Sequence, residues 1–254
     1  MQLQLAGADL HYDLSGDGEP LLWLHGGFGL GSDWTLIFNP PPDGYRIVAP
    51  DLRGHGRSNG AAPMYSFKQS AVDVFALLDH LKIDRIKVVG LSGGGITALH
   101  MATLQPARVA SMVVVSAPSA FPEQAKAMQR NFSEAMFGAD QGAAMRRRHP
   151  RPGQLDALLA QVRRMPDGPD PDFSRADLGT ITADTLIVFG DRDPLYPVTL
   201  AVELREAIPR SWLWVVPNGG HGPVFGPSAR PFAQMALAFL AGRYEDLPAL
   251  AGRA

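Results

Sequence analysis

The sequence contains no cysteine, and it has no apolar run as long as the roughly 18 residues that a membrane-spanning helix needs. The first absence excludes a disulfide framework, thiolate catalysis and metal sites built on cysteine. Acidic and basic residues nearly balance, and the formal net charge is −2. Bulk attraction to a phosphate backbone or to an anionic membrane is therefore absent. We expect neither a nucleic-acid partner nor membrane association.

Two further signals are missing. Residues 1–16 alternate apolar and polar side chains and lack the basic start and apolar centre of a signal peptide, so we expect a cytoplasmic protein. No Asp and His residues cluster at metal-ligand spacing, so a metal is not expected. One dense basic run, Arg146–Arg148 with Arg151 close behind, is interpreted as a solvent-exposed helix end. Contact of this run with phosphate or another anionic substrate group is the alternative. The sequence leaves the choice between a monomer and a homodimer open.

Short apolar runs alternate along the chain with longer segments of helical spacing. Most of these runs are continuous, which is typical of strands buried on both faces of a parallel sheet. The candidate strands are 21–25, 46–50, 86–91, 112–116, 185–189 and 213–216, and the candidate helices are 67–81, 93–105, 198–208 and 230–240. Residues 3–5 and 10–14 are typical of a leading antiparallel hairpin. The order predicts an α/β fold with a doubly wound, mostly parallel sheet.

Residues 120–180 interrupt this alternation, because they contain no convincing strand. They include amphipathic pieces at 123–137 and 154–165 and a loose Pro/Gly/Asp-rich stretch at 166–172. We interpret 120–180 as a mostly helical insertion over one edge of the sheet, between core segments 1–119 and 181–254. An ordinary pair of helices that cover the sheet is the alternative.

Ser92 lies in the segment Gly90-Leu91-Ser92-Gly93-Gly94, between a β-branched strand and a helix. A tight strand-to-helix turn brings neighbouring backbone very close, so glycines on either side remove the clash and the hydroxyl projects above the sheet edge. The following helix directs its N–H groups towards the site, which suits a developing oxyanion. Placement between strand and helix favours a nucleophile over the alternative, a serine that caps a glycine-rich turn.

A second glycine-rich segment, HGGFG at 25–29, follows the strand LLWLH. Glycine lets a backbone N–H approach a reacting carbonyl oxygen, so Gly27 and Gly93 are the candidate oxyanion donors. His25 sits at the strand end before the glycines, and we expect it to bond the loop backbone. A plain glycine loop is the alternative for the whole segment.

A catalytic serine needs a base and a carboxylate that orients the base. His221, between glycines in GGHGP at 219–223, is the best base among seven histidines. Asp193 lies further out on its loop than Asp191, so we favour Asp193, whereas Asp191 caps the turn or pairs with Arg192. Ser92, Asp193 and His221 each follow a different predicted strand, where open α/β sheets place their ligand sites. The order Ser, Asp, His is the one expected for this fold among serine-triad folds.

With these segments in place, the chain resembles the α/β-hydrolase family over almost its whole length. The matching segments are HGGFG with Trp34 downstream, DLRGHGRS at 51–58, GLSGG at 90–94, GDRDPLYP at 190–197 and GGHGP. The resemblance implies a cofactor-free hydrolase with a helical cap at about 120–180. It assigns Ser92 as nucleophile, Asp193 as acid and His221 as base, and it matches Gly27 and Gly93 to the oxyanion positions. Serine at 92 argues against haloalkane dehalogenases and epoxide hydrolases, which use aspartate, and Phe28 in place of proline weakens a peptidase interpretation.

The leading hypothesis is hydrolysis of a small-molecule carboxylic ester or lactone through an acyl-enzyme on Ser92. One alternative keeps the triad and hydrolyses a C–C bond of a dienoic or β-diketone compound. Another is a non-hydrolytic member of the fold, such as a lyase, a perhydrolase or a ligand receptor. Apolar side chains could line the substrate pocket, and packing between cap and sheet is the alternative for each; they are Phe28, Trp34, Phe121, Phe132, Met136, Phe137, Met165, Val224 and Phe225.

Overall fold

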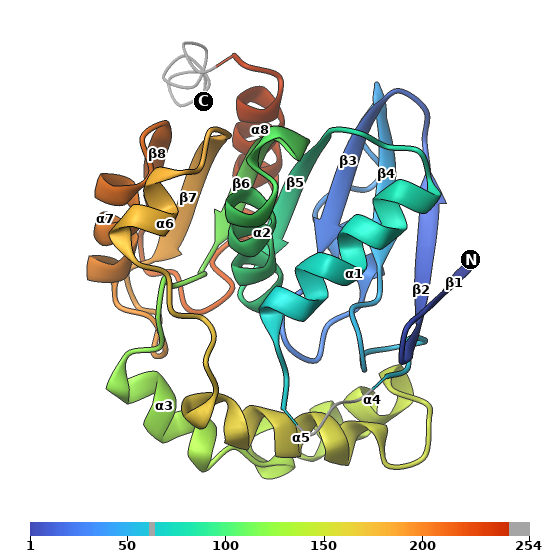
Figure 1. The fold of residues 1–254 in the computed structure, drawn as a ribbon. Helices are drawn as coiled ribbons and strands as arrows, with labels where there is room; N and C mark the ends of the chain where they lie inside the picture. The colour runs from blue at the N-terminus through green and yellow to red at the C-terminus, as the bar shows by residue number, and fades with distance from the viewer. Residues whose placement is uncertain (61–63, 244–254) are drawn as a thin grey trace.

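The computed structural model describes residues 1–60 and 64–243. One sheet has the strand order β1-β2-β4-β3-β5-β6-β7-β8 (Figure 1). The strands are β1 (Gln2–Leu5), β2 (Ala8–Ser15), β3 (Glu19–Leu24), β4 (Tyr45–Pro50), β5 (Ile86–Leu91), β6 (Val109–Val115), β7 (Asp184–Gly190) and β8 (Ser211–Val216). The pairs β1–β2 and β2–β4 are antiparallel, and the pairs from β4 through β8 are parallel. The predicted α/β fold with a mostly parallel sheet is confirmed.

Helices cover both faces of this sheet. One face carries α1 (Phe67–His80), α2 (Gly93–Leu104), α6 (Arg175–Gly179) and α7 (Val198–Ala207), and the other carries η1 (Gly31–Leu36) and α8 (Ala229–Leu240). Short 3₁₀ turns η2 (Pro106–Arg108) and η5 (Gly226–Ser228) precede β6 and α8. None of the helices in the described part of the chain combines the length and apolar character that crossing a bilayer requires.

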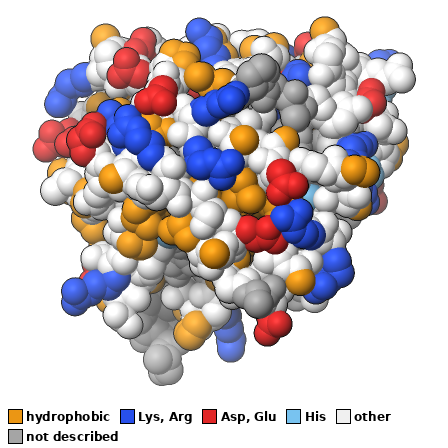
Figure 2. Space-filling view, turned by 90° about the horizontal axis from the view of Figure 1, so that it is seen from below, with side chains coloured by type: hydrophobic (Ala, Val, Ile, Leu, Met, Phe, Trp, Pro, Cys, Tyr) orange, Lys and Arg blue, Asp and Glu red, His pale blue; other side chains and the backbone are white. Residues whose placement is uncertain are grey.

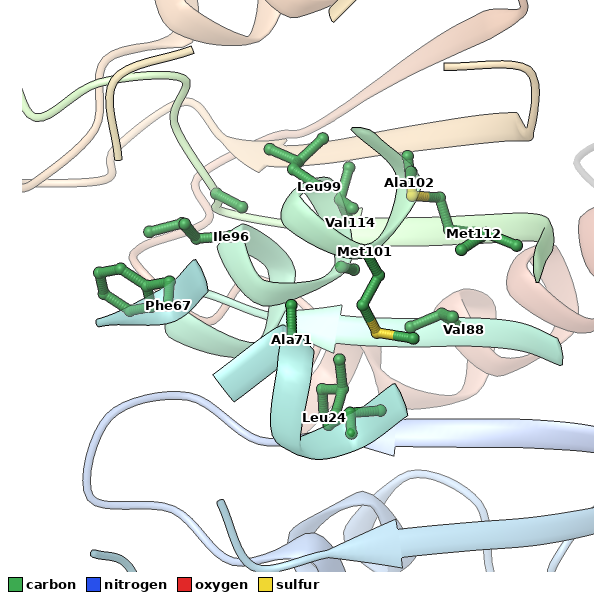
Figure 3. Packing of buried hydrophobic residues seen from close by; sticks show 14 of the residues in the cluster. Leu24, Phe67, Ala71, Val88, Ile96, Leu99, Met101, Ala102, Met112 and Val114 are labelled. Carbon is green, nitrogen blue, oxygen red and sulfur yellow. The ribbon is translucent and has the colours of Figure 1, made fainter. Parts of the chain in front are cut away.

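Alternating side chains of the strands fill the two cores. Leu24, Val88 and Val114 pack under α1 and α2, where Met101 and Leu99 lie against them (Figure 3). Their neighbours in the strands point to the opposite face, where Trp23, Val89 and Val113 meet the aromatic side chains of η1 and α8. Because both faces are covered, the strands are apolar on both sides, which explains their continuous hydrophobic runs.

A third group of helices lies beyond one end of the sheet (Figure 1). It consists of α3 (Glu123–Arg130), η3 (Glu134–Phe137), α4 (Ala139–Arg148), α5 (Gln154–Arg164) and η4 (Met165–Asp167), here named the α3–α5 layer (residues 123–167). A β-bridge between Ala120 and Asp172 joins the two chain segments that connect this layer to the sheet. Helix α6 packs against α7, and Leu178 lies in the sheet core. The domain limits 120 and 180 stay a prediction.

The outer face of the α3–α5 layer is seen in Figure 2, which views the molecule from that end. Lys and Arg side chains are interspersed there with Asp and Glu and with apolar side chains. The layer has its own small hydrophobic cluster, built mainly by Leu155, Leu158 and Leu159 of α5. The inner side of the α3–α5 layer faces one end of the sheet. The loops at that end of the strands form the candidate site.

Candidate active site

Ser92 occupies the turn between β5 and α2. Its backbone has φ 51° and ψ −117°, a strained conformation for a residue with a side chain. The turn is so tight that a Cβ on Gly90 would lie 2.5 Å from the Gly94 carbonyl oxygen, and one on Gly94 would lie 2.4 Å from that of Leu24. Glycine is therefore required at both positions. The Ser92 N–H donates to the Val115 carbonyl at 2.7 Å, which fixes the turn to the neighbouring strand β6.

The structure brings Ser92, His221 and Asp193 into one hydrogen-bonded chain. His221 Nε2 lies 3.0 Å from Ser92 Oγ, and His221 Nδ1 lies 2.9 Å from Asp193 Oδ2. The other carboxylate oxygen of Asp193 accepts the backbone N–H groups of Leu195 at 2.8 Å and Tyr196 at 3.1 Å. The Asp193 side chain is fully buried, so the carboxylate is oriented by these three partners.

The loops that carry Asp193 and His221 are fixed to one another by backbone contacts. Strands β7 and β8 pair as far as Gly190 and Val216, and beyond them Arg192 N–H donates to the Gly219 carbonyl at 2.8 Å. Asp191 is exposed and lies 3.9 Å from the Arg192 guanidinium. The second carboxylate of the segment therefore points away from His221.

Gly27 lies at the end of β3, opposite the start of α2. A Cβ on Gly93 would lie 3.8 Å from the Gly27 nitrogen, and one on Gly26 would lie 3.4 Å from Ser92 Cβ. As the first residue of α2, Gly93 has an N–H without a partner inside the helix. Among the described residues, Gly27 N–H has no hydrogen-bond acceptor. Two backbone N–H groups are thus available beside the Ser92 hydroxyl.

His25 uses both ring nitrogens to hold this loop. Leu52 N–H donates to Nε2 at 2.8 Å, so the ring proton is on Nδ1, which donates to the Gly26 carbonyl at 2.7 Å. Burial lowers the pKa of His25 and keeps the ring neutral. His55 lies beside it with a ring-centroid distance of 4.9 Å, and burial holds its pKa well below the usual value. His25 therefore has no free nitrogen for proton transfer.

Two cavities flank Gly26, Gly27 and Phe28. The first has a volume of about 30 Å³ and is lined by His25, Gly26, Gly27, Phe28, Leu52, His55, Tyr65, Phe67, Gly93, Leu158, Gln161, Val162 and Met165. The second has a volume of about 590 Å³ and is lined by His25, Gly26, Gly27, Phe28, Gly29, Asp33, Trp34, Leu36, Leu91, Gln141, Met145, Arg148 and Phe225. Each cavity combines sheet loops with residues of the α3–α5 layer. The first reaches Gly93 and the second reaches Leu91, the two sequence neighbours of Ser92.

The predicted pocket residues fall into three groups. Phe28 lines both cavities, Trp34 and Phe225 line the second, and Met165 lines the first. Phe132 and Phe137 lie one step further out, because their rings pack on Phe28. The other three, Phe121, Met136 and Val224, are not among the described residues that line either cavity.

Met136 and Val224 lie outside both cavities for opposite reasons. Met136 lies in the short turn η3 and is 50% exposed on the surface. Val224 is completely buried in the core beneath α8, next to Val216 and Phe232. Phe121 packs against Phe67 and Tyr196 instead. Counting apolar residues in a segment could not distinguish these environments.

The sequence prediction missed the wall that α5 contributes to the first cavity. Leu158, Gln161 and Val162 all line it. The signal was present, because Leu155, Leu158, Leu159 and Val162 form one apolar stripe at helical spacing.

The basic run needs a correction. Arg146 binds Glu134 and Asp156 inside the α3–α5 layer, but Arg148 Nη2 lies 2.6 and 2.5 Å from the two carboxylate oxygens of Asp33. The Arg151 guanidinium donates to the Ser58 carbonyl. The interpretation as a solvent-exposed helix end is therefore wrong for Arg148 and Arg151, which dock the layer onto the sheet loops.

Comparison with known proteins agrees with this fold. A family model described as the alpha/beta hydrolase fold matches residues 19–142. A Variovorax paradoxus protein whose name assigns it as a carbamate hydrolase, RutD, is 32% identical over 84% of this chain and 89% of its own length. The 2-hydroxymuconate semialdehyde hydrolase of Pseudomonas sp. strain CF600 is 29% identical over 93% of this chain and 92% of its own. Among solved structures, Est816, titled an N-acyl homoserine lactone degrading enzyme, has a TM-score of 0.77 at 27% identity and covers 95% of this chain and 99% of its own. The chain belongs to the α/β hydrolase fold family.

Proposed function

We propose that this protein is a serine hydrolase that cleaves a carboxylic ester or a lactone through an acyl-enzyme on Ser92. The observation that carries the proposal is the position of the His221 ring. One ring nitrogen lies 3.0 Å from Ser92 Oγ and the other lies 2.9 Å from the buried Asp193 carboxylate. A base within hydrogen-bond reach of a hydroxyl, and itself oriented by a third group, is the arrangement that activates a serine nucleophile.

In the proposed acylation, Ser92 Oγ attacks the carbonyl carbon while its proton passes to His221 Nε2. The Asp193 carboxylate keeps the other ring proton on Nδ1 and stabilises the imidazolium that forms. Negative charge develops on the former carbonyl oxygen, and the N–H groups of Gly27 and Gly93 are the proposed donors for it. The tetrahedral intermediate collapses when His221 returns the proton to the leaving oxygen, which releases the alcohol.

In the proposed deacylation, the same groups act on water. His221 removes a proton from a water molecule, which attacks the acyl carbon, and the two backbone N–H groups again hold the oxyanion. His221 then returns the proton to Ser92 Oγ, so the acid is released and the site is restored. In a lactone the leaving oxygen remains attached to the acyl part, so one product carries both groups.

Two observations support an ester or lactone C–O bond as the bond that is cleaved. The two cavities, which reach Gly93 and Leu91 on either side of Ser92 in the chain, have mostly apolar walls, which suit an uncharged acyl compound. Est816, whose title names lactone degradation, shares the fold over 95% of this chain. Hydrolysis of a C–C bond is the second candidate. The observation that favours it is the similarity to 2-hydroxymuconate semialdehyde hydrolase over nearly the whole chain.

A substrate panel tests the proposal. Nitrophenyl esters of increasing chain length, an acyl homoserine lactone and a dienoate are offered to the wild-type protein and to Ser92→Ala. We expect ester or lactone turnover that falls by about 10⁶-fold in Ser92→Ala, as removal of a triad serine does elsewhere. A fluorophosphonate should label Ser92, as located by peptide mass analysis. Turnover of the dienoate alone would favour C–C hydrolysis.

Ser116 provides a matched control. It follows β6 as Ser92 follows β5, it has φ 46°, and its N–H donates to the Val188 carbonyl at 2.8 Å. Its side chain, however, is fully buried. Ser116→Ala should retain the wild-type kcat and should still be labelled at Ser92. Full esterase activity in Ser92→Ala would contradict the proposed function.

A further inference from the structure

The loop that carries Gly27 reaches the α3–α5 layer through Phe28. The Phe28 ring stacks on Phe132 with a centroid distance of 5.5 Å and an interplanar angle of 9°, and it meets the edge of Phe137 at 5.2 Å. Leu155, Leu158 and Leu159 of α5 complete this hydrophobic cluster. Among the described residues of this cluster, Phe28 comes from a sheet loop and the others come from the α3–α5 layer. Its backbone has φ 59°, a strained conformation that the buried ring stabilises.

The same loop is bound to the layer a second time, through Asp33. Arg148 Nη2 donates to both carboxylate oxygens of Asp33, at 2.6 and 2.5 Å. Asp33 Oδ2 also accepts the Leu30 N–H at 3.0 Å, and a Cβ on Gly29 would lie 3.1 Å from that oxygen. The carboxylate therefore fixes the end of the turn that begins at Gly26, and Arg148 fixes the carboxylate.

The pair is partly shielded from water, because the side chain of Arg148 is 32% exposed and that of Asp33 is 23% exposed. Arg146, two residues earlier, differs in one respect. Its guanidinium binds Glu134 and Asp156, which both belong to the α3–α5 layer. The two arginines thus share a helix and a charge, but Arg148 alone of the two contacts the loop that carries Gly27.

We infer that Arg148 is a positioning residue for the hydrolytic reaction, acting through Asp33 on the loop that presents the Gly27 N–H. The inference rests on the proposed function. A donor stabilises the oxyanion only when it is held at the right distance and direction, so a looser loop costs transition-state stabilisation. Arg148 and Asp33 also line the second cavity, so KM for an uncharged ester distinguishes substrate contact from positioning of the loop. The contact of the α3–α5 layer with Asp33 therefore holds the Gly27 N–H in the position that the oxyanion requires.

The experiment compares Arg148→Gln, Asp33→Asn and the double variant with Arg146→Gln as the control. On a neutral nitrophenyl ester, we expect kcat to fall by about tenfold in each single variant while KM stays within about twofold. The double variant should lose no more than either single one, because the two side chains form one link. Asn keeps an oxygen for the Leu30 N–H, so the lost charge is what the variant tests. Arg146→Gln should retain the wild-type kcat.

Two further measurements separate positioning from stability. Phenylboronic acid forms a tetrahedral adduct with an active serine, and its inhibition constant should rise by about tenfold in Arg148→Gln and stay unchanged in Arg146→Gln. Hydrogen exchange of the peptide that spans residues 26–33 should be faster in Arg148→Gln and Asp33→Asn than in Arg146→Gln. This last readout does not depend on turnover.

Several results would overturn the inference while leaving the proposed function intact. The first such result is an active wild-type enzyme and an Arg148→Gln variant that keeps its kcat and loses only thermal stability. A change confined to KM is another, because it would assign Arg148 to substrate contact. If the wild-type protein neither hydrolyses the ester nor is labelled at Ser92, the proposed function fails, and the inference fails with it.

Discussion

The two halves of the candidate site are held in different ways. On one side, Asp193 and His221 lie on loops joined by backbone hydrogen bonds just beyond paired strands β7 and β8, and Ser92 is bonded to β6. On the other side, the loop that carries Gly27 is held largely by side chains. Some of them belong to the sheet core, as His25 does, and Arg148 and the aromatic partners of Phe28 belong to the α3–α5 layer.

This difference indicates that the sheet positions the proposed nucleophile and base, whereas the loop of the proposed oxyanion donor Gly27 also depends on the α3–α5 layer. Backbone pairing is the same for almost any sequence that forms these strands. Side-chain contacts between two layers change with single substitutions. We therefore expect changes in the α3–α5 layer to alter oxyanion stabilisation and pocket shape without disturbing the hydrogen-bonded chain of Ser92, His221 and Asp193.

After loss of the Ser92 hydroxyl, the largest effect on the sheet side is expected from Asp193→Asn. The amide keeps an oxygen for the Leu195 and Tyr196 N–H groups, but it removes the charge that stabilises the His221 imidazolium and favours the wrong ring tautomer. We expect kcat on a nitrophenyl ester to fall by about 10⁴-fold. Steady-state kinetics over a range of ester concentrations measures this loss.

Asp191→Asn is the matched control, because Asp191 is exposed on the same loop and pairs with Arg192. It should retain kcat within about twofold, as surface ion pairs contribute little. Equal losses in the two variants would mean that the loop as a whole, and not the carboxylate at 193, supports the reaction.

A smaller effect is expected on the other side, from Phe28→Ala. The change removes a buried ring from the hydrophobic cluster of the α3–α5 layer and leaves a cavity, so the free energy of unfolding should fall by about 3 kcal/mol. Because Gly27 precedes Phe28, kcat should fall as well, while the pKa read from the kcat/KM profile stays at its wild-type value. Urea unfolding and a pH–rate profile measure the two effects.

Phe28→Leu separates burial from ring stacking. Leucine keeps most of the buried apolar volume, so its free energy of unfolding should fall by only about 1 kcal/mol. A shift in the pKa of the kcat/KM profile of Phe28→Ala would contradict this division. It would show that the Gly27 loop and the hydrogen-bonded chain of Ser92, His221 and Asp193 are not independent.

The same division explains how far the sequence could predict this protein. The strands, the main helices and the segment around Ser92 follow from apolar runs and glycine spacing, because local backbone geometry determines them. The sequence places Met136 in the pocket as an apolar residue of the insertion and Val224 because it follows His221, but only packing reveals one at the surface and the other in the core. The role of Arg148 depends on Asp33, which lies 115 residues away in the chain, and no local pattern records that contact.

The smallest predicted effect concerns His149, which follows α4 and is only 3% exposed. Among the described residues, neither of its ring nitrogens has a hydrogen-bond partner, and His55 lies 5.8 Å away between ring centroids. Burial, with the positive charge of Arg148 and the ring of His25 nearby, lowers the pKa of His149 to about 4, and the Asp51 carboxylate opposes this shift. The neutral ring is therefore the form that fits between the layers.

Because the folded pKa of His149 is below its ordinary value of 6.5, the unfolded chain binds a proton that the folded protein does not. Its contribution is complete above about pH 6.5 and is lost as the pH falls towards 4. Between pH 7 and 5.5 we expect the wild-type free energy of unfolding to fall by about 1 kcal/mol more than that of His149→Phe, in which the ring cannot be protonated. His80→Gln, a change at an exposed histidine, should follow the wild-type curve. If the free energy of unfolding depends on pH in the same way for the wild type and His149→Phe, protonation of His149 does not destabilise the folded protein.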